Sequence, residues 1–296
     1  MARFPKLKPS SGSFSSKTVV GTRRRRASSV TFMDVKGELC GLKIAVFTSF
    51  VNACVTILCM ENKTTGFLLV DKPAGWTSFD VVAKLRSITG IRKIGHAGTL
   101  DPFATGLLVV AIGREATKRI DQFVKQSKTY ETQFKIGETS TTGDPEGEIK
   151  PVDDGGKYDA WPNQERIEQA IQKAFLGEIQ QKPPMHSAIK IGGQKLYTLA
   201  RQGKEIDRPY RTVTIHRFDV ISYKDAILTA VIDVSSGTYV RVIAQDLGEY
   251  FGLGAYCLQL RRTRIGDFFV KDAHAIDQIS KDNWQSFLIN TDVLVN

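Results

Sequence analysis

The stretch GHAGTLDPFATGLLVV, residues 95–110, constrains the fold most, because a loop of small residues runs directly into an apolar strand. A single carboxylate, Asp101, stands in that loop directly before Pro102. Gly95 and Gly98 keep the loop thin enough for a bulky planar ligand to approach the backbone, and the proline favours an extended backbone at the aspartate. A carboxylate presented in this way is either a turn residue or a nucleophile or base.

The segments around this loop predict an α+β fold. Strands come in neighbouring pairs and mix with helices, which favours a largely antiparallel sheet. A regular βαβ alternation and a G-x-G-x-x-G motif are both missing from the sequence, which argues against a dinucleotide-binding fold. Strands are predicted at 67–70, 107–113 and 211–223 and within 128–144, 226–236 and 255–270, and helices at 79–90, 115–127 and 163–177, with a further helix after the tight turn at Gly237.

Length and charge place the chain among ordinary globular proteins. It has 296 residues, 42% of them hydrophobic and 24% charged. The net charge of +10 suggests nucleic acid as a partner, but residues 1–60 hold ten Lys or Arg and only two acids. The body is therefore nearly neutral, and bulk charge does not identify the partner.

Cysteine usage argues against disulfides and zinc in the body. Of the four cysteines only Cys257 lies outside the first sixty residues, and no Cys–His spacing resembles a metal site. We expect a reduced, intracellular protein with no metal and no cofactor, in which Cys257 is a small buried apolar residue.

Residues 1–59 form a leader that we expect to lie outside the fold, with the catalytic domain at 60–296. The leader is rich in Ser and Arg and then carries a run without charge, 44–60. Three interpretations remain open: an over-extended reading frame with Met60 as the true start, an organelle transit peptide, and a membrane anchor.

Two further stretches contain candidate site residues. Tyr130 lies on a predicted strand, where a tyrosine is either part of the core or a stacking platform for a base. Tyr239 and Arg241 follow the tight turn at Gly237, and two residues apart on a strand they would share a face. An arginine beside Asp101 would keep that carboxylate ionised and aimed through a bidentate pair.

Basic residues are scattered along the chain, at loops and helix rims. If folding gathered them on one side they would form a track for phosphates, although scattered bases are more often solvated. They are Lys84, Arg86, Arg92, Lys93, Lys190, Lys195, Arg201, Lys204, Arg261, Arg262 and Arg264.

Five stretches in a fixed order resemble the motifs of the TruB family of tRNA pseudouridine synthases. The resemblance covers residues 66–268, and its first two motifs are highly specific. It implies a pseudouridine synthase fold, with a mixed, mostly antiparallel sheet flanked by helices. The stretches are GFLLVDKPAGWTSFDVV (66–82), GHAGTLDPFATGLLVV (95–110), KTYE (128–131), SSGTYVRVIAQDLG (235–248) and LRRTRIGDF (260–268).

The resemblance also implies the reaction and the role of each matching residue. Asp101 is implied as the nucleophile that lets the glycosidic bond of a uridine move from N1 to C5. Tyr130 would stack on the flipped uracil and assist proton transfer, and Arg241 would pair with the aspartate. His96 would stack in the gap left in the RNA. The residues implied to line the pocket are Lys72, Tyr239 and Leu260.

The usual substrate of the family is the T-loop uridine at position 55 of tRNA. By the resemblance we expect the T arm as the partner, with contacts from 144–162 and 181–211. The chain ends about thirty residues after RIGDF, so we expect a short form without the family's C-terminal PUA domain, in which this last stretch forms a closing helix and strand of the catalytic domain. We further expect a cytoplasmic monomer without a membrane or a protein partner, or an organelle protein if the leader is a transit peptide.

Two other functions remain as alternatives to the synthase. An RNA-binding or RNA-folding protein of the same fold would not need the Asp101 chemistry. A carboxylate-dependent hydrolase would need a second acid near Asp101, and no motif offers one, since Asp71 and Asp80 lack paired spacing.

Overall fold

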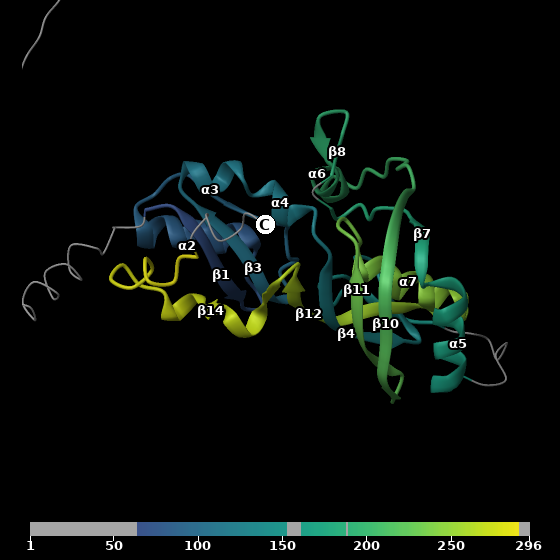
Figure 1. The fold of residues 1–296 in the computed structure, drawn as a ribbon. Coiled ribbons are helices and arrows are strands. Elements are labelled where there is room, and N and C mark those ends of the chain that lie inside the picture. Colours follow the sequence, from purple (N-terminus) through teal and green to yellow (C-terminus); the bar gives the residue numbers. More distant parts are fainter. Residues whose placement is uncertain (1–63, 153–160, 188, 290–296) are drawn as a thin grey trace, which may run out of the picture. The chain divides into compact units, whose positions relative to one another are not determined.

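The computed structural model describes residues 64–152, 161–187 and 189–289 (Figure 1). The leader expected at 1–59 lies outside the described residues. Within the described ranges the strands are β1 (Gly66–Lys72), β2 (Ile94–His96), β3 (Thr105–Ile112), β4 (Lys128–Ile136), β5 (Glu138–Ser140), β6 (Ile149–Pro151), β7 (Gly177–Gln181), β8 (Lys190–Ile191), β9 (Gln194–Lys195), β10 (Arg211–Lys224), β11 (Ile227–Val234), β12 (Ala255–Ile265), β13 (Phe268–Phe269) and β14 (His274–Ala275). The α-helices are α2 (Ser78–Thr89), α3 (Arg114–Lys118), α4 (Asp121–Val124), α5 (Gln164–Ala174), α6 (Leu196–Arg201) and α7 (Val240–Tyr250).

One large sheet organises the described part of the chain. Its strands run in the order β14-β1-β3-β12-β4-β11-β10-β7, with β2 paired to β3 and β13 paired to β12. Only the β1–β14 and β3–β12 pairs are parallel, and the other pairs of this sheet are antiparallel. The prediction of a mixed, mostly antiparallel sheet in an α+β fold is confirmed.

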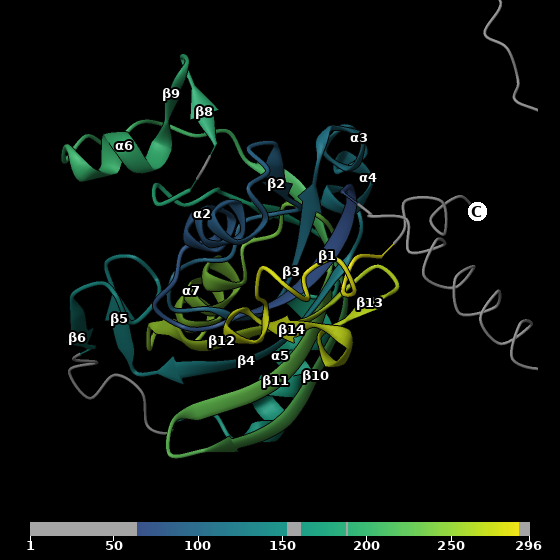
Figure 2. The same ribbon diagram turned by 90° about the vertical axis from the view of Figure 1, so that its left-hand side faces the viewer.

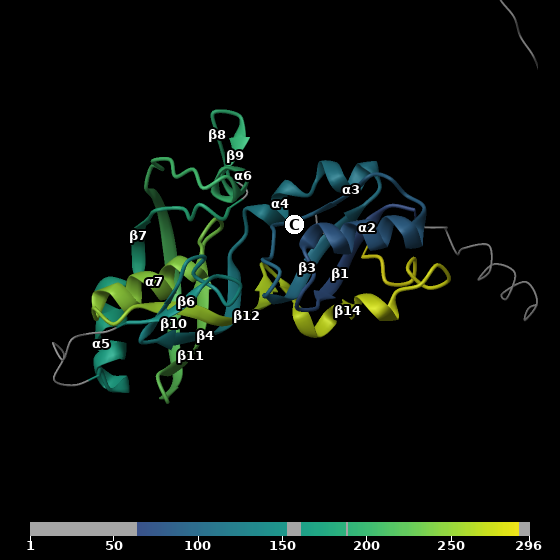
Figure 3. The same ribbon diagram turned by 180° about the vertical axis from the view of Figure 1, so that it is seen from behind.

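Strands β1 and β3 are buried on both faces, which explains why their sequences are nearly continuous apolar runs. Because successive side chains on a strand point to opposite faces, Leu68 and Val70 join one apolar cluster while Phe67 and Leu69 join another. Helix α2 covers the first face, and Figure 3 shows it alongside β1 and β3. The second face packs against α3 and α4, which contribute buried residues to that cluster.

Helix α2 begins and ends where its sequence predicts. The Thr77 hydroxyl accepts a hydrogen bond from the amide of Asp80, whose carboxylate accepts in turn from the amide of Thr77. This reciprocal capping satisfies two amides that have no partner inside the helix. Gly90 ends the helix with φ of +71°, a conformation that costs glycine little.

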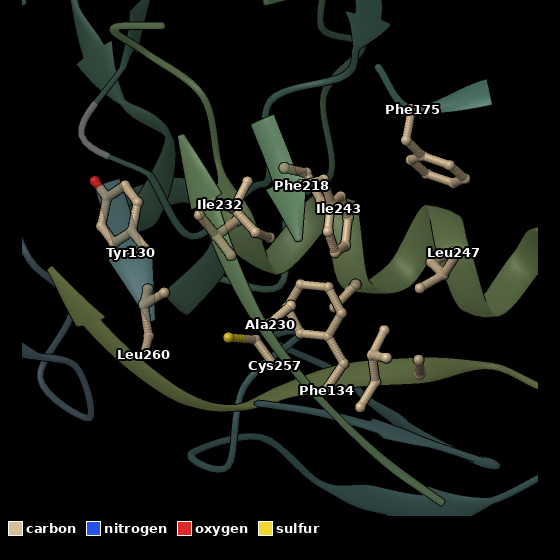
Figure 4. Close-up of a cluster of buried hydrophobic side chains, with 14 of the residues drawn as sticks. Tyr130, Phe134, Phe175, Phe218, Ala230, Ile232, Ile243, Leu247, Cys257 and Leu260 are labelled. Carbon is tan, nitrogen blue, oxygen red and sulfur yellow. The ribbon is translucent and has the colours of Figure 1, made fainter. Parts of the chain in front are cut away.

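The other end of the sheet encloses a second core with α5 and α7. Strands β4, β10, β11 and β12 direct apolar side chains against these helices, and Figure 4 shows Phe134, Ile232, Ile243 and Leu247 among them. Cys257 is fully buried in this cluster, as predicted for a small apolar residue.

Two small two-stranded sheets lie outside the main sheet. One pairs β5 with β6, and the other pairs β8 with β9. Figure 2 shows β8, β9 and the following helix α6 standing off the large sheet. Both small sheets belong to segments for which we predicted RNA contact, 144–162 in part and 181–211.

Three local predictions are wrong. Residues 239–241 are not a strand: Tyr239 is the N-cap of α7, because the turn at Gly237, with φ of +85°, ends the chain's run along β11. The helix predicted at 115–127 is split into α3 and α4. The helix expected near the C-terminus is replaced, within the described residues, by short 3-10 turns at Val270–Asp272 and Ile276–Gln278 beside β14.

Candidate active site

The loop that carries Asp101 connects β2 to β3 and is tied to the start of helix α2. The Ser78 hydroxyl accepts a 2.9 Å hydrogen bond from the amide of Leu100 and donates to the carbonyl of the same residue at 3.2 Å. The amide of Gly75 donates to the carbonyl of Pro102 at 2.8 Å. Both neighbours of Asp101 in the chain are therefore held by the turn and helix that follow β1.

Lys72 secures this turn from inside. Its side chain is fully buried, and Nζ donates to the carbonyls of Pro73 at 2.8 Å, Trp76 at 2.6 Å and Pro102 at 3.3 Å. Burial lowers the pKa of Lys72 to about 8. The three carbonyl bonds offset the cost of burying an ammonium group, so the structure places Lys72 behind the loop, next to the residue that follows Asp101.

Arg262 holds the two flanks of the same loop. Its side chain is fully buried, with Nη2 donating to the carbonyl of Gly98 at 3.1 Å and Nε donating to the carbonyl of Leu107 at 2.8 Å. Gly106 passes against the Arg262 backbone, where an added Cβ would collide with the carbonyl oxygen. The loop is thus fixed at its entrance, at its exit and on both sides of Asp101.

Asp101 forms an ion pair with Arg241 from the first turn of α7. The distance from Arg241 Nε to Asp101 Oδ2 is 2.9 Å. The pair uses one nitrogen of the guanidinium, so the bidentate geometry we expected is wrong. Arg241 itself is 3% exposed, whereas the Asp101 side chain is 33% exposed. The buried partner thus orients a carboxylate that keeps an open side for a ligand.

The guanidinium of Arg241 is shared with a second acid that the sequence reasoning missed. Nη1 lies 3.2 Å from Oδ2 of Asp144 and donates to the carbonyl of Thr142 at 2.6 Å. Nη2 donates to the carbonyl of His186 at 3.0 Å. Because each nitrogen has a fixed partner, the planar group cannot rotate freely, and a rigid fork of this kind is what arginine offers over lysine.

Asp144 is held as firmly as the arginine. Its Oδ1 accepts from the Thr142 hydroxyl at 2.5 Å and from the amide of Glu146 at 3.1 Å. The expectation that no second acid lies near Asp101 is therefore wrong. The sequence signal was weak, since TSTTGD (139–144) reads as an ordinary Gly/Asp turn at the end of a strand.

Neighbouring acids contribute to the raised pKa values of Asp101 and Glu146. Burial raises the pKa of Asp101, with a further contribution from Asp144, while Arg241 and Lys72 act in the opposite direction. Burial also raises the pKa of Glu146, again with contributions from Asp144 and Asp101. A carboxylate whose pKa is raised is a stronger base when ionised, which suits a group that attacks or abstracts a proton.

Tyr130 and Leu260 lie next to each other at the margin of the second core. Each is 8% exposed, and both belong to the cluster that includes Leu100 of the Asp101 loop. Figure 4 shows the Tyr130 hydroxyl pointing away from the other labelled side chains of this cluster. The ring is therefore supported by the core while its polar end is directed outward.

Tyr239 and His96 lie at two other parts of the site. Tyr239 is half-buried at the start of α7, two residues before Arg241, and burial raises the pKa of its hydroxyl. His96 ends β2 ahead of the loop, and burial together with the charge of Arg262 lowers its pKa. Within the described residues Nδ1 of His96 has no hydrogen-bond partner.

Three of the basic residues proposed as a phosphate track make contacts within the protein. Arg262 is buried, as described above. Arg261 pairs with Asp71 at 2.7 Å, and Arg264 lies 3.7 Å from Asp233. Arg262 is therefore not available to a nucleic acid backbone, whereas Arg261 and Arg264 are partly exposed beside their acidic partners.

In the described ranges of the chain no group of three or more His, Cys, Asp or Glu side chains could hold a metal ion. None of the helices in the described part of the chain has the length and apolar character needed to span a bilayer.

Solved structures with this fold define the class of protein. The chain resembles a Cbf5-Nop10-Gar1 complex at 25% identity and a TM-score of 0.58, over 77% of this chain and 60% of that chain. It resembles the archaeal box H/ACA sRNP Nop10-Cbf5 complex at 23% identity and a TM-score of 0.54, over 75% and 55%. The chain therefore spans somewhat more than half of these solved chains, and its fold is that of a pseudouridine synthase.

Sequence relatives narrow this class to one family. The family described as "TruB family pseudouridylate synthase (N terminal domain)" matches residues 86–240. The chain is 42% identical over 224 residues to the tRNA pseudouridine synthase B of Arthrobacter sp. (strain FB24), covering 74% of this chain and 71% of that protein. It is 45% identical over 212 residues to that of Endomicrobium trichonymphae, covering 72% and 90%. The chain belongs to the TruB family.

Proposed function

We propose that this protein isomerises the T-loop uridine at position 55 of tRNA to pseudouridine, with Asp101 as the nucleophile. The observation that carries the proposal is the 2.9 Å ion pair between Arg241 and Asp101, in the loop that bears the family's second motif. An open carboxylate oriented by a buried arginine can act as a nucleophile.

The proposed reaction needs no cofactor, but it needs a pocket that holds the extruded uridine. The bond from C1′ of the ribose to N1 of uracil breaks, and a bond from C1′ to C5 forms. The hydrogen on C5 leaves as a proton and N1 takes one up, so nothing is oxidised or reduced. Because a stacked base cannot rotate in place, the uridine is extruded first, at a cost of a few kcal/mol in unstacking.

The residues around Asp101 divide this work in the proposed reaction. Tyr130, held by the core with its hydroxyl directed outward, stacks on the flipped uracil and assists proton transfer. Arg241 keeps the carboxylate ionised and oriented. Leu260 beside Tyr130 and Tyr239 beside Arg241 line the pocket.

Lys72 acts on the pocket indirectly, through the loop backbone, whereas His96 contacts the RNA itself. Lys72 maintains the pocket wall by holding the carbonyl of Pro102, since within the described residues its Nζ donates to three backbone carbonyls. His96, uncharged because its pKa is lowered, takes the place of the extruded base in the RNA stack.

Segment 181–211 has the surface chemistry of an RNA contact. Tyr197 and Tyr210 are exposed, and the Arg201 guanidinium lies 5.8 Å from the centre of the Tyr197 ring. Exposed aromatic rings with nearby arginines bind single-stranded RNA through stacking and charge. Lys204 and Arg211 add exposed positive charge to the same segment. These observations support the proposed contact between this segment and the T arm.

The remaining parts of the proposal concern context. The proposed catalytic domain is residues 60–296, and its proposed partner is the T arm of tRNA. We propose that the protein acts in the cytoplasm and is a monomer. We propose that segment 144–162, which includes strand β6, contacts the RNA together with segment 181–211.

Tritium release tests the proposed reaction. The full chain is incubated with a T-arm stem-loop whose uridines carry tritium at C5, and tritium in water is measured. We expect release by the wild type, none by Asp101→Asn, and normal release by Asp219→Asn, an exposed aspartate in a surface pair with Arg217. Binding of the stem-loop by Asp101→Asn is expected to persist.

Other outcomes would change the proposal in defined ways. Release from full-length tRNA but not from the stem-loop would keep the chemistry and change the substrate. Binding of RNA without release from any RNA would favour the alternative of an RNA-binding or RNA-folding protein. Loss of RNA binding in Asp101→Asn would mean that the aspartate is structural.

A further inference from the structure

Gln181 makes a pair of hydrogen bonds that the reaction described above does not use. It is the last residue of β7, its side chain is 1% exposed, and it reaches across to Tyr239, 58 residues further along the chain. Its Nε2 donates to the carbonyl of Tyr239 at 3.1 Å, and its Oε1 accepts from the amide of Tyr239 at 2.8 Å. The amide therefore holds both polar backbone atoms of one residue.

Tyr239 is the residue on which helix α7 begins. Its own side chain makes no capping hydrogen bond, so the helix start has no local side-chain cap. Its carbonyl also accepts the first bonds of the helix, from the amides of Val242 at 3.1 Å and Ile243 at 3.3 Å. The Gln181 amide thus sets the position of the first helical turn from outside the helix.

That first turn carries Arg241. The guanidinium must reach Asp101, Asp144 and the carbonyl of His186 at the same time, which leaves little tolerance for a shift of the helix start. Burial of both Gln181 and Arg241 excludes water as a substitute partner. A displacement of about 1 Å at a group that aligns a nucleophile can cost 100-fold in rate.

The same strand end leads into the segment proposed to contact RNA. Gln181 and His186 lie five residues apart, and each is bonded to the start of α7, one through Tyr239 and the other through Arg241. The stretch that leaves the sheet toward β8, β9 and α6 is therefore attached at two points to the helix turn that orients Asp101.

We infer that Gln181 is a positioning residue for the isomerisation, which fixes the first turn of α7 so that Arg241 aims Asp101, and which joins this turn to the rest of the RNA-contacting segment 181–211. The inference rests on the proposed function. Gln181 does not touch the uridine; its effect passes through Tyr239 and Arg241.

The test compares Gln181→Met with Gln180→Met in the full chain. Gln180 is the adjacent, exposed residue of the same strand and bonds to Thr212 across the sheet, so it controls for the loss of a glutamine from β7. Single-turnover tritium release at saturating RNA is expected to slow about 10- to 100-fold in Gln181→Met. RNA affinity should stay within about threefold, and Gln180→Met should match the wild type within about twofold.

Gln181→Glu gives a readout that a merely structural role would not produce. An ionised glutamate can accept from the Tyr239 amide but cannot donate to its carbonyl, whereas a protonated one does both. The rate of this variant relative to the wild type is therefore expected to rise as pH falls. The charged or titratable groups that act on Tyr239 are Asp101, Arg211 and Arg241. All three are present in both proteins, so their own titration cancels in the ratio of the two rates.

Three results would overturn the inference. The first is Gln181→Met turning over within about twofold of the wild type. The second is a Gln181→Met variant whose loss of rate is matched by equal losses of RNA affinity and thermal stability, together with a Gln181→Glu variant whose rate relative to the wild type does not change with pH. The third is a wild type that releases no tritium, which would overturn the proposed function as well.

Discussion

Replacing Arg241 by methionine tests the centre of the site. Methionine keeps most of the side-chain volume but removes every hydrogen bond of the guanidinium. Two carboxylates, Asp101 and Asp144, then lose their shared counter-charge, and the carbonyls of Thr142 and His186 lose a donor. The change should therefore affect both the rate and the stability of the fold.

The expected loss of rate follows from the lost orientation and charge. Removing one preorganised group that stabilises charge in an active site costs about 2.7–4 kcal/mol, or roughly 100- to 1,000-fold. Arg241 is one of the groups that hold down the pKa of Asp101, so its removal moves that pKa further up. Because the side chain of Asp101 is one-third exposed, water replaces part of the lost interaction. We therefore expect the lower part of this range, about 100-fold.

The expected loss of stability comes mainly from Asp144. This carboxylate is 5% exposed, and breaking a buried ion pair by removing one partner costs about 3–5 kcal/mol. Arg217→Met is the control, since its pair with Asp219 is half exposed on both sides and contributes less than about 1 kcal/mol.

Rate and stability are measured separately to test this reasoning. Single-turnover tritium release is followed at a temperature well below the unfolding midpoint, and urea unfolding gives the change in free energy. If Arg241→Met, folded and binding RNA, released tritium within about fivefold of the wild type, the pair would not orient the nucleophile. If its unfolding free energy matched that of Arg217→Met, the burial argument for Asp144 would be wrong.

Two further predictions concern pH and the leader. Since burial and Asp144 raise the pKa of Asp101, and the reaction needs its ionised form, activity should be full at high pH and decline as pH falls. The decline should begin at a higher pH than an ordinary aspartate would give, and in Arg241→Met at a higher pH still; a wild-type profile flat down to the ordinary aspartate range would contradict this. Deletion of residues 1–59 is expected to leave a folded protein with wild-type tritium release; an insoluble or inactive product would refute the domain boundary.

Local sequence signals predicted several elements well. Thr77, Asp80 and Gly90 mark the two ends of helix α2, and these signals act within one turn of the chain. The apolar runs of β1 and β3 predicted strands, since a run of that length buries both faces only inside a sheet. The residue patterns favoured a largely antiparallel sheet, while the resemblance implied its mixed form and the synthase fold.

Local signals failed where a single residue redirects the chain. The sequence predicted a tight turn at Gly237 and a helix in the stretch after it, but Tyr239 and Arg241 were placed on a strand between the two. The helix instead begins directly after the turn, at Val240, which puts Arg241 in the first turn of α7. The pairing of Arg241 with Asp101 spans 140 residues, and it was expected only through the family resemblance.

By itself, the sequence determined the class of fold, the ends of helix α2, the burial of Cys257 and the small loop that presents Asp101. Only the tertiary structure decided that Asp144 shares the guanidinium of Arg241 and that Gln181 holds the start of its helix. The physical reason is distance along the chain. Capping, turns and apolar periodicity depend on neighbouring residues, whereas each hydrogen bond that aims Asp101 joins strands and helices brought together only when the sheet is complete.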